Sequence, residues 1–210
     1  MAAGLHPVLL AVPGTARALP PRERVRFLSR FAREAVRRSA ARGGFRLAEL
    51  AKDVRGAPRP AGGLFWSLAH KPEWVAGVVA PHPVGIDLET VADRPAGLFA
   101  RIARPREWAL LAGEAPQVAF ARLWTAKEAV LKASGRGLAG LADCRLVGRE
   151  GPERLLLEHA GRGWAVAQRL LKAAVAAVTV EEAPADWRIE LDAGGEGEPG
   201  GRLDTKDGEG

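Results

Sequence analysis

The amino-acid sequence predicts an α+β chain of two similar halves, because each of two long helical patterns is accompanied by short strands in antiparallel order. In the first half, an apolar run at 8–12 precedes a helix at about 22–42, and strand patterns follow at 64–69 and 74–80. The second half begins with a strand pattern at 84–89. Its further elements are helices at 105–111 and 117–134 and strands at 143–147, 154–158, 164–169 and 173–181.

The helix expected at 22–42 is bounded by residues that commonly begin and end helices. Pro20-Pro21 precedes it and Gly43-Gly44 follows it. Its apolar stripe consists of Val25, Leu28, Phe31, Ala32, Ala35 and Val36. Its other face carries Arg22, Arg26, Arg30, Arg33, Arg37 and Arg38. The spacing therefore predicts one buried and one strongly basic face.

Turn residues predict how the strands of the first half connect. The glycine- and proline-rich segment 55–63 is expected to be a loop. Pro81-His82-Pro83 follows the strand pattern at 74–80, and we expect it to turn the chain back toward Val84. The segments 74–80 and 84–89 would then form a hairpin whose outgoing strand carries Asp87 and Glu89.

Two short segments carry the chemistry-bearing side chains. In 84–89, apolar and polar residues alternate, so Gly85, Asp87 and Glu89 are expected on one face of the strand. In 124–132, Glu128 and Lys132 lie four residues apart on one face of a helix. Magnesium shares its coordination between carboxylates, waters and substrate phosphates, so carboxylates beside a lysine are typical of a phosphate-handling site.

Length and composition indicate a globular protein. The 210 residues suffice for one large domain or two small ones, and 47% are hydrophobic against 27% charged. No apolar run approaches the roughly 20 residues needed to cross a bilayer, and the N-terminus lacks a signal-peptide pattern. With the single cysteine, Cys144, no intrachain disulfide can form. We therefore expect a cytoplasmic protein with no membrane partner.

Charge is distributed unevenly along the chain. Residues 192–210 hold six acidic residues against two basic ones and are rich in glycine, so we expect a disordered tail. The whole chain has a net charge of +6 and this tail contributes −4, so residues 1–191 carry about +10. A basic nucleic-acid-binding protein is one alternative consistent with this charge. However, the chain has no tyrosine and no recognisable nucleic-acid-binding motif, so we expect no nucleic-acid partner.

Each candidate residue also has a purely structural interpretation. Asp87 and Glu89 could form the solvent face of an edge strand, and Glu128 and Lys132 could be an exposed helical ion pair. A lone histidine such as His70 is more often structural than functional. The order of the three features, a histidine, a strand diacid and then a helical lysine–glutamate motif, favours the functional interpretation.

This order resembles the 4′-phosphopantetheinyl transferases over about residues 55–140. Gly85-Ile86-Asp87-Leu88-Glu89 is similar to the family's Gly-Ile-Asp-x-Glu motif, and 124–132 to its Trp-x-x-Lys-Glu-x-x-x-Lys motif. Ser67-Leu68-Ala69-His70 lies where the family has a Ser-His pair, and Gly135-Arg136-Gly137-Leu138 also fits. The length resembles the larger single-chain type, whose halves are related by pseudo-twofold symmetry with the active site at their interface. This resemblance implies a monomer.

The resemblance implies a reaction and its residues. The 4′-phosphopantetheine arm of coenzyme A would pass to a serine of an apo acyl or peptidyl carrier protein, releasing adenosine 3′,5′-bisphosphate. The implied Mg²⁺ ligands are Asp87, Glu89 and Glu128, and the implied catalytic residues are Glu128, as base, and Lys132. The implied contacts to coenzyme A are His70, Arg30, Arg59, Lys127, Lys132 and Asp87. Residues 1–83 would hold the coenzyme A-binding elements, and 84–191 the metal and catalytic motifs.

Two departures from the family pattern leave a second alternative open. Ala57 stands where the family has lysine in Gly-Lys-Pro, and Ala69 stands where it has serine. Arg59 could replace the missing lysine from two residues further on. A catalytically weak module that binds carrier proteins is therefore the remaining alternative to a transferase.

Overall fold

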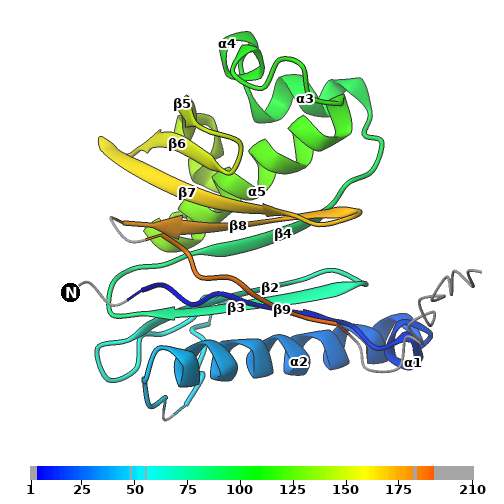
Figure 1. Cartoon of the computed structure of the whole chain (residues 1–210), viewed down its shortest axis with the longest axis vertical. Helices are drawn as coiled ribbons and strands as arrows, with labels where there is room; N and C mark the ends of the chain where they lie inside the picture. The colour runs from blue at the N-terminus through cyan, green and yellow to red at the C-terminus, as the bar shows by residue number, and fades with distance from the viewer. Residues whose placement is uncertain (1–3, 48, 55, 182–183, 192–210) are drawn as a thin grey trace, which may run out of the picture.

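The computed structural model describes residues 4–47, 49–54, 56–181 and 184–191 and confirms the α+β class. Two mainly antiparallel sheets stack on each other, and one long helix covers the outer face of each (Figure 1). These helices are α2, Pro21–Arg42, and α5, Pro116–Ser134. The layers therefore run helix, sheet, sheet, helix, with a shared apolar core between the sheets.

The first sheet has the strand order β2-β3-β1-β9. Its strands are β1 (Val8–Ala11), β2 (Phe65–His70), β3 (Trp74–Ala80) and β9 (Arg188–Glu190). The hairpin β2–β3 is antiparallel, with Ser67 opposite Val78, and β3 is also antiparallel to β1. The short strand β9 adds to β1 in parallel. Although β9 belongs to the expected second half of the sequence, it joins the sheet that contains the first strand.

The second sheet has the strand order β4-β8-β7-β6-β5, with all neighbours antiparallel. Its strands are β4 (Ile86–Thr90), β5 (Arg145–Glu150), β6 (Arg154–His159), β7 (Arg162–Leu170) and β8 (Ala174–Val180). Among the described strands, β4 thus lies at the edge of this sheet, with β8 beside it. Asp87 lies opposite Ala177 and Glu89 opposite Val175.

The predicted hairpin between 74–80 and 84–89 is wrong. β3 pairs with β2, whereas β4 pairs with β8, almost ninety residues further along the chain. The segment Pro81-His82-Pro83 carries the chain from one sheet to the other, and its two prolines have no N–H to donate across a hairpin. Thr179 accepts a hydrogen bond from the Gly85 N–H at 3.0 Å and so directs the chain to β8.

Each long helix packs closely against the backbone of one glycine. A Cβ on Gly77 of β3 would lie 2.3 Å from the backbone nitrogen of Val36 in α2. A Cβ on Gly85 would lie 1.9 Å from the carbonyl oxygen of Ala129 in α5. No side chain fits at either distance, so these glycines set how closely each helix packs. The predicted stripe of α2 is buried at Leu28, Ala32, Ala35 and Val36, but Val25 is 56% exposed.

The remaining elements are short. The expected helix at 105–111 is present as α4, Pro105–Ala109. The sequence patterns missed α1 (Gly14–Arg17), α3 (Ala96–Ile102), the 3₁₀ helix η1 (Gly137–Asp143) and β9. The expected tail at 192–210 lies outside the described residues. Among the described helices, none has the length and apolar character to span a membrane.

Candidate active site

A cleft of about 620 Å³ lies where the loop before β2, the strand β2 and the C-terminal end of α5 meet. Lys52, Ala57, Ser67, Lys132 and Arg136 are among the residues that line it. The cleft therefore collects residues from four of the motifs that the sequence separates by up to eighty positions.

The edge strands β2 and β4 of the two sheets are joined directly beside this cleft. The Ile86 N–H on β4 donates a hydrogen bond to Ser67 Oγ on β2 at 3.1 Å. Ser67 is 3% exposed, so this bond is shielded from water. The seam between the sheets is thus held by a polar contact, which fixes the position of Asp87, the next residue.

Lys132 completes the seam from the helix side. Its Nζ donates to Asp87 Oδ1 at 2.7 Å, to the Ile86 carbonyl at 3.0 Å and to the Leu68 carbonyl at 3.5 Å. These acceptors belong to β4 and β2, so one ammonium group binds both sheets. The side chain remains 32% exposed and lines the cleft. Its position is therefore compatible with contact to a bound anion.

Asp87 and Glu89 are not a solvated strand face. Both are buried on the α5 side of β4, at 8% and 7% exposure. Glu89 forms ion pairs with Lys71 at 2.9 Å and with Arg94 at 3.0 Å. Burial raises the pKa of Asp87, and the nearby Lys132 only partly offsets this effect. Perturbed pKa values such as that of Asp87 cluster at functional sites, which makes Asp87 a candidate site residue.

Glu128 is the third expected metal ligand. Burial, and then the charge of Asp87, raise the pKa of Glu128, so the two carboxylates lie within electrostatic reach. In the described part of the chain, however, no three His, Cys, Asp or Glu side chains are placed to hold a metal ion. The expected three-carboxylate site is therefore not assembled in this conformation, because Lys71 and Arg94 hold Glu89 and Lys132 holds Asp87.

The donor chemistry nevertheless fits a hard cation at Asp87 and Glu128. Carboxylate oxygens are the ligands that Mg²⁺ prefers. The Glu128 carboxylate makes no hydrogen bond or ion pair with any other described side chain. Its pKa is raised by burial and then by the charge of Asp87, which the nearby Lys132 and Lys71 only partly offset, and a divalent cation would favour its charged form. Glu89 could join such a site only by exchanging Lys71 or Arg94 for the cation.

Positive charge surrounds the cleft. Burial lowers the pKa of His70, and Lys132, Lys52 and Lys71 lower it further. Burial also lowers the pKa of Lys52, with added repulsion from Arg33 and Lys132. The neighbouring basic groups are therefore close enough to His70 and Lys52 to disfavour their charged forms. A bound polyanion would remove that repulsion.

Lys127 is placed away from the cleft. Its ammonium group donates to the Ile102 carbonyl at 2.6 Å and pairs with Glu107 at 2.8 Å, and both side chains are 2% exposed. The hydrogen bonds to Glu107 outweigh the effect of burial and lower the pKa of this carboxyl. This position favours a structural role for Lys127 over the expected contact with coenzyme A.

The expected arginine contacts differ from those that the structure brings near the cleft. Arg30 and Arg59 are exposed and are not among the described residues that line it. Sequence reasoning instead missed Lys52, which lies across a β-bridge from Pro58, next to Ala57. It also missed Arg94. Neither residue belongs to a motif, and only the fold places them beside the site.

The geometry agrees with the comparisons to known proteins. A model of the 4′-phosphopantetheinyl transferase superfamily matches residues 83–189, which includes β4, α5 and the second sheet. The chain belongs to this superfamily. The matched residues include Asp87, Glu128 and Lys132.

Curated relatives point the same way. The 4′-phosphopantetheinyl transferase gsp of Aneurinibacillus migulanus is 32% identical over 90 residues, covering 41% of this chain and 38% of that protein. The 4′-phosphopantetheinyl transferase HetI of Nostoc sp. is 35% identical over 103 residues, covering 45% and 43%. The corresponding protein psf-1 of Bacillus pumilus is 32% identical over 77 residues, covering 35% and 33%. The matches thus span well under half of these relatives.

Proposed function

We propose that this chain transfers the 4′-phosphopantetheine arm of coenzyme A to a serine of an apo acyl or peptidyl carrier protein. One observation carries the proposal: the cleft lined by Lys132 lies at the seam between the sheets, next to buried Asp87. Several basic side chains gather there, namely Lys52, His70, Lys71 and Lys132. A volume of about 620 Å³ is within the range of small-molecule sites. Its positive charge suits the phosphates of coenzyme A.

The reaction forms one phosphorus–oxygen bond and breaks another. The serine hydroxyl attacks the pantetheine-side phosphorus of the pyrophosphate, and adenosine 3′,5′-bisphosphate leaves. Glu128 would accept the serine proton, since its raised pKa brings it closer to the range of an efficient general base. Lys132 would stabilise charge on the phosphate oxygens as the bonds exchange. Mg²⁺ held by Asp87 and Glu128, with Glu89 after exchange, would neutralise the pyrophosphate.

Lys52 takes the place of the lysine that the family motif has at position 57. It lines the same cleft as Ala57 and faces the same loop through its bridge to Pro58. Burial and then Lys132 lower the pKa of Lys52, and Lys52 in turn helps to lower the pKa of His70, so the three groups lie near one another. A phosphate contact from Lys52 would therefore maintain coenzyme A binding, and it replaces Arg59 in this proposed role.

We further propose that the two halves are related by pseudo-twofold symmetry. In the first half, β1-α2-β2-β3 gives the order β2-β3-β1; in the second, β4-α5-β7-β8 gives β7-β8-β4. Each long helix follows the first strand and covers its sheet. The proposed site lies at the seam of the halves, and both come from one chain, so the protein would act as a monomer.

The direct test is transfer to apo carrier proteins. The protein is incubated with coenzyme A, Mg²⁺ and a panel of carriers from fatty acid, polyketide and nonribosomal peptide systems. Intact-protein mass spectrometry then detects the added arm. Modification that needs both Mg²⁺ and coenzyme A is the expected result. Folded protein that modifies no carrier, but still binds some of them, would support the binding-module alternative.

Two variants connect the activity to the site. Asp87→Asn should reduce transfer by at least about a hundredfold, because it removes charge required in the transition state. Glu181→Gln, which changes an exposed carboxylate directly after β8, is the matched control and should transfer at the wild-type rate. Equal activity of Asp87→Asn and wild type would show that the buried aspartate is structural.

A further inference from the structure

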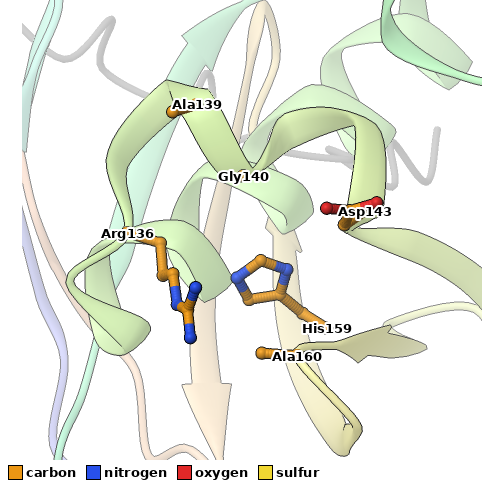
Figure 2. A pocket seen from close by; sticks show the side chains of 6 residues that line it. All are labelled: Arg136, Ala139, Gly140, Asp143, His159 and Ala160. Atoms are coloured by element: carbon orange, nitrogen blue, oxygen red, sulfur yellow. The ribbon is translucent and has the colours of Figure 1, made fainter.

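A second pocket lies on the far side of Arg136 from the cleft, under the 3₁₀ helix η1. Its volume is about 300 Å³, and it is lined by Arg136, Ala139, Gly140, Asp143, His159 and Ala160. Figure 2 shows the His159 ring between Arg136 and Asp143, with one ring nitrogen directed toward Arg136 and the other toward the side of Asp143. None of these residues takes part in the proposed chemical step, although Arg136 also lines the cleft.

His159 is the main evidence for a ligand. Its side chain is buried, at 2% exposure, and neither ring nitrogen has a hydrogen-bond partner among the described residues. A neutral imidazole always presents one donor and one acceptor, and leaving them unpaired in a buried site is costly. Native proteins rarely leave such groups unpaired, so each case calls for an explanation.

The pocket is built around the ring. A Cβ on Gly140 would lie 2.8 Å from His159 Cε1 and 2.8 Å from Leu131 Cδ2, so a side chain at this position would require the imidazole or Leu131 to shift. The guanidinium of Arg136 and the carboxylate of Asp143 also make no hydrogen bond or ion pair within the described part of the chain. One buried imidazole without a partner and two exposed charged groups, one cationic and one anionic, therefore line the same small pocket.

These three groups select among ligand chemistries. A guanidinium fork binds two oxygens of an anion, and His159 can then donate to a third. A carboxylate has only two oxygens, whereas a phosphate has three or more. Asp143 would repel a fully deprotonated anion but accepts a hydrogen bond from a hydroxyl on the ligand. The volume is at the lower end of small-molecule sites.

We propose that this pocket binds a small hydroxyl-bearing phosphate, either inorganic hydrogen phosphate or a polyol phosphate monoester. Arg136 and His159 bind the phosphate oxygens, and Asp143 accepts a hydrogen bond from the ligand hydroxyl. Arg136 also lines the cleft, so a ligand on one side competes for the guanidinium with a ligand on the other. By linkage, the effect of each ligand on the other's affinity is reciprocal.

The test uses NMR of ¹⁵N-histidine-labelled protein, whose chain has only four histidines. Inorganic phosphate, glycerol 3-phosphate and sulfate are titrated separately, and the signal of His159 is assigned with His159→Gln. If that variant does not fold, replacing the other three histidines singly assigns the signal by elimination. Both phosphate probes should shift the His159 signal in a saturable way, and sulfate, which has no hydroxyl, should bind more weakly.

Replacing exposed arginines tests whether phosphate binding depends on the pocket. Arg136→Gln should weaken phosphate binding about tenfold, since it removes a charge-assisted pair. Arg101→Gln, an exposed arginine on α3, is the control and should leave binding unchanged. Sulfate binding as tightly as phosphate would overturn the role of Asp143. No shift of His159 with either phosphate probe, or a shift confined to His70 on β2, would overturn the proposal.

Discussion

The buried pair of Glu107 and Lys127 allows a sharp test of the structural role assigned to the motif lysine. Glu107 accepts hydrogen bonds from Lys127 Nζ at 2.8 Å and from the backbone N–H groups of Arg104 and Leu146, each at 2.9 Å. This one carboxylate therefore ties α4, β5 and α5 together. Glu107→Gln keeps the shape but leaves Lys127 charged, buried and without a counter-ion.

The expected loss follows from that uncompensated charge. Removing one partner of a buried pair costs about 3–5 kcal/mol. For a domain of this size, that loss lowers the melting temperature by about 6 to 20 °C. The exposed Glu181 is the matched control, and Glu181→Gln should cost less than about 1 kcal/mol. A double replacement, Glu107→Leu with Lys127→Met, should recover much of the loss because no charge remains buried.

Urea denaturation gives the measurement, with a shift of midpoint at unchanged slope taken as a change in stability. Because the pKa of Glu107 is lowered in the folded protein, its contribution is complete above the unfolded value of about 4.3 and is lost as pH falls through the folded value. Wild type and Glu107→Gln should therefore converge in stability under acid conditions. A loss below about 1 kcal/mol at neutral pH would refute the reasoning.

Three further predictions concern single positions. Gly85→Ala should destabilise the fold by more than about 3 kcal/mol, the upper end of ordinary overpacking, because the new Cβ meets a backbone carbonyl at 1.9 Å. Gly163→Ala, where a Cβ has open space, is the control and should be nearly neutral; thermal melting measures both. Equal melting points would contradict the close packing of α5. Burial raises the pKa of Cys144 to about 12, so a thiol reagent at pH 8 should label native protein far more slowly than urea-unfolded protein; equal rates would show that the thiol is accessible. Lys52→Ala should raise the KM for coenzyme A about tenfold with little change in kcat, and Ala57→Lys in that background should restore it; an unchanged KM would remove Lys52 from coenzyme A binding.

Local patterns in the sequence were sufficient to predict the main elements and to single out Asp87 and Lys132, which the structure brings together. The alternation around Asp87 marked the strand, and the helical spacing of Glu128 and Lys132 marked the helix. This strand, β4, and this helix, α5, meet at the seam between the two sheets, where Lys132 contacts Asp87. The reason is physical: alternation and helical periodicity are properties of a few consecutive residues.

Strand partners and off-motif residues could not be predicted in the same way. The alternation at 84–89 is the same whether β4 pairs with β3 or with β8, and the choice depends on Thr179 and on a core formed by distant residues. Lys52 and Arg94 carry no local signal because their roles depend on which loops the fold brings together. Lys127 illustrates the opposite case, since its place in a motif did not reveal that it is buried.

The return of β9 to the first sheet affects how the protein can be made and divided. On the ribosome, β1 emerges early, but its parallel neighbour at 188–190 emerges after every other described strand. Arg38 and Arg42 of α2 pair with Glu190 and Asp186, so the same late segment also binds the first helix. A fragment ending at residue 83 would expose the edge of β1 and the apolar face normally covered by the second sheet. We therefore expect the two sheets to mature together, and not as separable folding units.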